Sequence, residues 1–151
     1  MRTRLVLGPL AAAVMAMLAF VGAAVASPPQ PVTLSVLTMI APGAVDEFTS
    51  TGGVICSSGT ATTDVRHFVG FQSGNQAQIL LVKHFVCDDG SGTFDLLLRA
   101  KLDFATSDTV GTWTVIGGTG EYARLHGAGK LTGKGMGETV LDEYTGTMHI
   151  N

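Results

Sequence analysis

Two cysteines and four histidines are the residues of this chain best suited to metal, redox or nucleophilic chemistry. The histidines are His67, His84, His126 and His149. No two of them stand two or four residues apart, and none lies at zinc-ligand spacing from a cysteine, so the sequence contains no local metal clip. The GxSxG elbow of serine hydrolases is also absent. We therefore predict no catalytic residue, no metal site and no cofactor.

The cysteines, Cys56 and Cys87, form the one pair that the chain offers. Outside the cytoplasm such a pair usually forms a disulfide. It would close a loop of about thirty residues and stabilise the fold by roughly 3 kcal/mol in the chain-entropy model. A metal or redox pair is the alternative, but the sequence has no CxxC motif. We predict the disulfide.

The first 26 residues have the pattern of an export signal. Arg2 and Arg4 precede an apolar run over 5–25, which ends in the small-x-small sequence Ala24-Val25-Ala26. A retained membrane anchor is the alternative, because the run is nearly long enough to span a bilayer. We predict a signal peptide at 1–26 that is cleaved off and a secreted, extracytoplasmic protein. A linker at 27–31 and a single domain at 32–151 would then follow.

The net charge of the mature chain limits the classes of molecule that it is expected to bind. Loss of Arg2 and Arg4 lowers the basic count from 9 to 7 against 12 acidic residues, so the mature net charge is −5. Nucleic acids and anionic membrane surfaces both favour clustered positive charge, and the remaining basic residues are scattered. We expect neither nucleic acid nor, after cleavage, a membrane as the partner.

The apolar residues of the mature chain recur with a period of two, which predicts strands. The clearest is 93–104, where one face carries Phe94, Leu96, Leu98, Ala100, Leu102 and Phe104. It follows a second strand at 77–87 and the turn cluster 88–92, so 77–104 predicts a β-hairpin. Calcium binding by the acidic turn is a weaker interpretation, since the EF-hand order is missing. Weaker strand candidates are 32–40, 53–57, 64–71, 111–116, 122–132 and 139–149. Seven or eight short strands without crossover helices predict an all-β sandwich or up-and-down barrel.

Glycines cluster at 117–120 and 127–129. A dinucleotide fingerprint must open a helix, whereas these glycines lie between predicted strands. The pattern before Gly133-Lys134 also lacks the glycine and the Ser or Thr of a phosphate-binding loop. We interpret the glycines as tight turns, bulges and points of close backbone approach.

The same region carries a family resemblance. The segment 111–123 (GTWTVIGGTGEYA), followed by Leu125-His126-Gly127-Ala128-Gly129, resembles the GGTG-x-aromatic…G-x-G strand-turn-strand of the allene oxide cyclase and dirigent-like β-barrels. The segments 85–94 and 144–146 are similar to small secreted actinobacterial proteins of that group. The resemblance implies an antiparallel up-and-down barrel of about eight strands, often a homo-oligomer, with an apolar lumen open at one end. Its known members cyclise or steer reactive intermediates, and their catalytic residues lie outside the glycine signature.

A small closed barrel either fills its interior with side chains or encloses one ligand. The apolar face of 94–104 and Trp113 could line a pocket for a lipid-like or polycyclic molecule, or could simply form the core. The candidate ligand-binding residues are Phe94, Leu96, Leu98, Trp113, His84 and Tyr122.

Three functions remain open. The first is a non-enzymatic extracellular barrel that binds a small apolar ligand or serves as an accessory protein, and it predicts a lumen without ionisable groups. The second is a cyclase or isomerase, which needs a polar group in the lumen, such as His84 or Tyr122. The third is an interaction protein that uses its outer surface, with a charged patch of Arg99, Lys101, Asp95 and Asp103. We favour the first.

Overall fold

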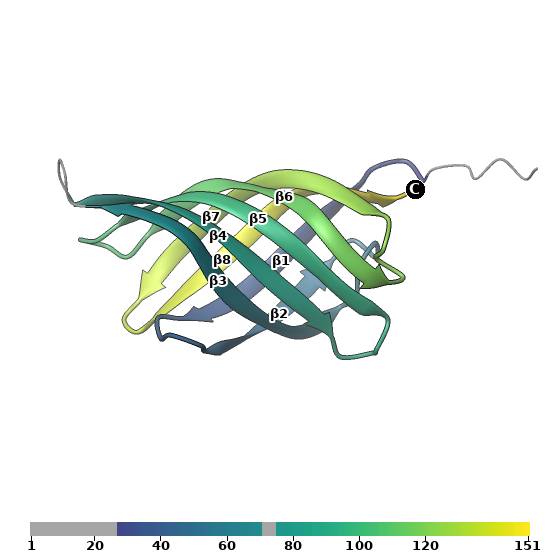
Figure 1. Cartoon of the computed structure of the whole chain (residues 1–151), viewed down its shortest axis with the longest axis horizontal. Helices are drawn as coiled ribbons and strands as arrows, with labels where there is room; N and C mark the ends of the chain where they lie inside the picture. Colours follow the sequence, from purple (N-terminus) through teal and green to yellow (C-terminus); the bar gives the residue numbers. More distant parts are fainter. Residues whose placement is uncertain (1–26, 71–74) are drawn as a thin grey trace, which may run out of the picture.

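The structure, a computed structural model, describes residues 27–70 and 75–151 and is a closed antiparallel barrel (Figure 1). The strands are β1 (Gln30–Met39), β2 (Val45–Thr51), β3 (Ser58–Gly70), β4 (Gln76–Cys87), β5 (Gly92–Asp103), β6 (Thr109–Gly120), β7 (Leu125–Met136) and β8 (Thr139–Ile150). Each pairs with its neighbours in the sequence, and β1 pairs with β8 to close the barrel. The predicted fold class is confirmed.

The expected signal peptide at 1–26 lies outside the described residues. In the described ranges, no helix is long and apolar enough to cross a membrane. The expected linker at 27–31 ends inside the barrel, because Gln30 already pairs with Met148 of β8.

Alternation in β5 places its apolar residues in the lumen, as the sequence predicts. Phe94 and Leu96 are fully buried and Leu98 is 2% exposed, while Arg99 and Lys101, on either side of Ala100, face solvent. The predicted hairpin at 77–104 is also present, because β4 pairs with β5 along its length.

The weaker candidate at 53–57 was wrong. These residues form the connection between β2 and β3, and the strand before them, β2, was not predicted. The sequence of β2, VDEFTST, carries Asp46 and Glu47, which are depleted in strands and mask its alternation.

Aromatic side chains fill one half of the lumen. The rings of Phe85 and Phe94 stack with centroids 4.7 Å apart, and Phe48 packs edge-on against both at 5.1 and 6.0 Å. Trp113 is 1% exposed and its indole N–H donates to the Lys130 carbonyl at 3.0 Å. This half of the lumen is a solid core.

Two glycines make room for that tryptophan. A Cβ added at Gly129 or Gly146 would lie 2.6 or 2.7 Å from the Trp113 ring, closer than real Cβ contacts. At the turn after β6, Gly120 has a φ of 61°, in the left-handed region that glycine tolerates best. The prediction of turns and close backbone approach is confirmed at these positions.

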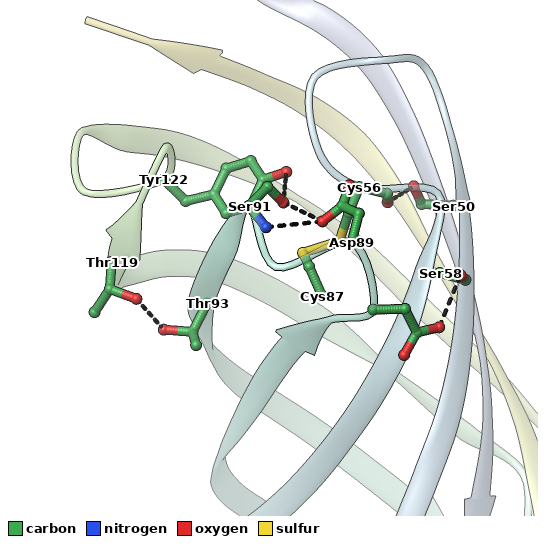
Figure 2. Close-up of a disulfide and its surroundings, with 10 residues drawn as sticks. Ser50, Cys56, Ser58, Cys87, Asp89, Ser91, Thr93, Thr119 and Tyr122 are labelled. Carbon is green, nitrogen blue, oxygen red and sulfur yellow. Dashed lines mark hydrogen bonds between the residues drawn. A yellow bond between two sulfur atoms is a disulfide. The ribbon is translucent and has the colours of Figure 1, made fainter.

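The Cys56–Cys87 disulfide ties the β2–β3 connection to the end of β4 (Figure 2). This is also the end of the barrel that holds the aromatic core. The Ser50 hydroxyl donates to the Cys56 carbonyl at 2.6 Å and fixes the same connection to β2. The predicted disulfide is confirmed. A disulfide of this kind is compatible with an extracytoplasmic protein.

We expect the double variant Cys56→Ala/Cys87→Ala to unfold more easily. The bond joins residues 31 positions apart, and releasing such a loop lowers the free energy of unfolding by about 3–4 kcal/mol. Urea denaturation at pH 7 measures the loss, and wild-type protein kept in reductant should match the variant. An unchanged denaturation midpoint in both would contradict a structural role for the bond.

Candidate functional site

The other half of the lumen holds a cavity of about 290 Å³. It lies at the end opposite the disulfide, because its lining residues come from the start of β4 and the end of β5. Ile40 and Phe104, both partly exposed, stand at its mouth. Its apolar wall consists mainly of Ile79, Leu81, Leu98, Ala100, Leu102, Leu131 and Val140.

A buried ion pair forms part of the cavity wall. The Lys83 ammonium of β4 lies 2.9 Å from a carboxylate oxygen of Asp46 on β2, and each side chain is 2% exposed. Lys83 also donates to the Thr38 hydroxyl at 2.6 Å, and the second Asp46 oxygen accepts from the Met39 N–H at 2.9 Å. Buried charges require such partners, because each loses its hydration.

A second carboxylate, Asp142 of β8, extends this network. One of its oxygens accepts from the Thr38 hydroxyl at 2.8 Å and the other from the Thr109 hydroxyl at 3.0 Å. Burial raises the pKa of Asp142, against the opposing effects of these hydrogen bonds and of Lys83. Gly133 of β7 leaves the necessary space, since a Cβ there would collide with the Asp142 carboxylate and the Thr109 hydroxyl.

The Tyr144 side chain completes the inner end of the cavity. It is fully buried, and its ring packs edge-on against Phe85 with centroids 6.3 Å apart. Within residues 27–70 and 75–151, its hydroxyl is the one buried side-chain polar atom without a hydrogen-bond partner. Leaving a buried hydroxyl unpaired costs about 1–3 kcal/mol.

Burial also fixes the protonation state of this tyrosine. Desolvation first, and then the nearby charges of Asp142 and Asp46, raise the pKa of Tyr144 well above its ordinary value. The group therefore remains a neutral O–H, which can donate a hydrogen bond into the cavity.

The residues that we predicted for the ligand site lie in three places. Leu98 lines the cavity. Phe94, Leu96 and Trp113 belong to the solid half of the lumen. Tyr122 lies at the disulfide end, where its hydroxyl shares a hydrogen bond with Ser91 at 2.9 Å (Figure 2).

His84 lies apart from the cavity, on the opposite side of β4 from Lys83. Its imidazole bonds to Asp95 at 2.8 Å, and the two side chains are 41% and 34% exposed. His84 and Tyr122 are therefore not among the polar groups that line the cavity. The expectation of a lumen without ionisable groups was wrong, because Lys83, Asp142 and Tyr144 all line it.

The sequence analysis did not identify the polar residues of the cavity and its ion pair, and these residues differ in how visible they are in the sequence. Alternation along 77–87 places Lys83 on the same face as Leu81 and Phe85. Its inward direction could therefore have been predicted from its position in the strand. Asp142 and Tyr144 likewise share a face with Val140. Asp46 had no signal, because its strand was not predicted.

The cavity lining thus combines a charged donor, Lys83, a neutral donor, Tyr144, and a carboxylate, Asp142, with an apolar wall. Four further hydroxyls line it, those of Thr38, Thr63, Ser107 and Thr109. This set can orient a polar atom of a bound molecule, and its carboxylate could exchange a proton with it. In the described part of the chain, no group of three or more His, Cys, Asp or Glu side chains could hold a metal ion. Comparisons of the chain with protein-family models, curated proteins and solved structures find no match.

We expect Lys83→Met to destabilise the barrel strongly. It leaves Asp46 and Asp142 buried without their cation, and breaking a buried pair in this way lowers the free energy of unfolding by about 3–5 kcal/mol. Urea denaturation at pH 7 measures the loss. The double variant Lys83→Met/Asp46→Asn should recover most of it, since asparagine can still accept from the Met39 N–H.

Lys101→Met is the matched control, because Lys101 is exposed on β5. Its free energy of unfolding should change by less than about 0.5 kcal/mol. A Lys83→Met variant as stable as this control would show that the buried pair does not form.

The carboxyl of Asp142 should make stability fall as pH rises. Its pKa is higher in the folded protein than in the unfolded chain, so above about pH 4 the unfolded chain loses this proton first. The contribution to stability present at low pH is therefore lost as pH rises through the folded pKa. Asp142→Asn removes this component, so its free energy of unfolding should decline less between pH 4 and pH 7 than that of the wild type.

Urea denaturation at a series of pH values measures the difference. Glu143→Gln, at the exposed neighbouring position of β8, is the control and should keep the wild-type pH dependence. Identical pH profiles for wild type and Asp142→Asn would refute the proposed burial of an ionisable carboxyl.

Proposed function

We propose that this protein is an exported barrel that binds one small, mainly apolar molecule in its lumen. The observation that carries the proposal is the cavity, whose lining combines an aliphatic wall with Tyr144, the residue whose buried hydroxyl has no partner among the described residues. Ligand sites are typically mostly apolar with a few placed polar groups, and at about 290 Å³ this one is at the small end of their range.

Export is supported by two independent features. The N-terminal pattern of two arginines, an apolar run and Ala24-Val25-Ala26 is that of a cleaved signal. The Cys56–Cys87 bond is compatible with an oxidising, extracytoplasmic compartment. We infer that the mature chain begins at Ser27, so the protein recovered from culture medium should lack residues 1–26. A full-length chain held in the membrane fraction would contradict cleavage and release of the mature protein.

A cyclase or isomerase of the allene oxide cyclase and dirigent-like group is the second candidate. It is favoured by the ionisable groups of the lumen, Lys83 and Asp142, which could stabilise or transfer charge in a bound intermediate. The closed eight-stranded barrel is the fold that the glycine-rich resemblance implies. A binding protein returns its ligand unchanged, whereas an isomerase converts it to a product of the same mass, so chromatography of a ligand recovered from the protein distinguishes the two.

The binding proposal is tested with mature protein and the dye N-phenylnaphthylamine, whose fluorescence rises in apolar surroundings. We expect saturable binding of one dye per chain. Ala100→Phe places a ring in the cavity and should weaken binding at least about tenfold. Ala123→Phe, at an exposed turn at the opposite end, is the matched control and should bind as the wild type does.

Circular dichroism checks that the variants are folded, and Val140→Phe is a second cavity-filling change in case Ala100→Phe is not. Failure of the wild type to saturate overturns the proposal. Equal binding by the wild type and a folded cavity-filling variant overturns it as well, because the dye would then bind elsewhere.

A further inference from the structure

The polar groups of the lumen differ in how many hydrogen bonds they already make. All four carboxylate oxygens of Asp46 and Asp142 already accept hydrogen bonds, from Lys83, from the Met39 N–H, and from the hydroxyls of Thr38 and Thr109. Each of these carboxylate oxygens is thus already held by one donor, whereas the donors of the lumen are only partly used.

Two of the side chains that line the cavity keep an unused donor. The Tyr144 O–H has no partner among the described residues, and its side chain lines the cavity. A lysine ammonium has three N–H donors, and Asp46 and Thr38 take two of those of Lys83. A carbonyl oxygen has two lone pairs and brings no donor of its own, so it matches this pair of donors.

The charges of the lumen network favour some ligands over others. Lys83 is the one cation of the lumen network, and Asp46 and Asp142 are its two acids. A ligand carboxylate would add a further anion where no second cation is available to pair with it. A ligand ammonium would lie beside Lys83, whose like charge repels it. An uncharged ligand avoids both costs.

We propose that the molecule bound in the lumen carries an uncharged carbonyl group, as in a ketone or aldehyde, whose oxygen accepts hydrogen bonds from the Tyr144 hydroxyl and the Lys83 ammonium. Its apolar body then lies along the aliphatic wall toward the mouth at Ile40 and Phe104. This inference rests on the proposed ligand-binding function and adds the chemical class of the ligand.

Four small probes of similar size and different polar ends test it: acetophenone, ethylbenzene, benzoate and benzylamine. A cavity of about 150 Å³ is enough to bind benzene, so each probe fits the larger cavity here. Their dissociation constants are measured at pH 8 by displacement of N-phenylnaphthylamine from mature protein. We expect acetophenone to bind about tenfold more tightly than ethylbenzene, and benzoate and benzylamine to bind more weakly than acetophenone.

Tyr144→Phe removes only the hydroxyl. It should reduce the preference for acetophenone over ethylbenzene by about threefold or more, with the affinity for ethylbenzene unchanged. The variant should fold normally, because this hydroxyl holds no other group in place. Tyr122→Phe is the matched control, since Tyr122 lies at the disulfide end and bonds to Ser91, and it should keep the full preference.

The outcomes separate this inference from the function on which it rests. If ethylbenzene binds as tightly as acetophenone, or if benzoate or benzylamine binds most tightly, the carbonyl inference falls while ligand binding stands. A preference that survives Tyr144→Phe overturns the role of this hydroxyl. If the dye binds and no probe displaces it, the carbonyl inference alone falls, whereas a dye that does not bind removes the proposed function itself.

Discussion

Closure of the sheet is the constraint on which the rest of this structure depends. Once β1 pairs with β8, the inward-facing side chains of the strands share one interior, although 62–69 of β3 remain exposed. A residue in that interior is stable there if it is apolar, paired or glycine, and among the described residues the Tyr144 hydroxyl is the exception. The chain meets this condition differently at its two ends, with stacked aromatic rings at the disulfide end and a cavity with a polar network at the other.

The polar network is difficult to explain by stability alone. Replacing a buried ion pair by apolar residues of similar volume is often neutral or stabilising, and this lumen buries an additional acid, Asp142, beside the Lys83–Asp46 pair. A polar cluster that contributes little net stability and lines a cavity fits a role in recognition better than a role in the core. The glycine at position 133 supports this view, because it gives up side-chain packing to accommodate the Asp142 carboxylate and the Thr109 hydroxyl.

Local patterns predicted most of the fold but little of the site. Alternation over 93–104 is a property of one strand, and the hairpin at 77–104 needs only its own turn, so both could be recognised from the sequence. The site depends on closure: Lys83 meets Thr38 across 45 residues, and Thr38 meets Asp142 across 104. No short-range pattern reports such pairs. The charged residues of β2 also concealed the strand that supplies Asp46, because a buried acid in a short strand looks like a loop residue.

The two tyrosines show why position in the barrel decides their roles. Tyr122 and Tyr144 are both buried, and both rings pack against a phenylalanine of the same core. Tyr122 lies beside the turns of the disulfide end, where Ser91 satisfies its hydroxyl. Tyr144 lies where the solid half gives way to the cavity, so its ring packs in the core while its side chain also lines the cavity. Its hydroxyl is buried and has no partner among the described residues. The disulfide and the aromatic stack hold the ring in place, and a ring held rigidly presents its hydroxyl at a defined point. Under the proposed function, this placement would let the hydroxyl orient the ligand, since a fixed donor in an apolar wall selects both where a polar atom sits and which kind of atom it is.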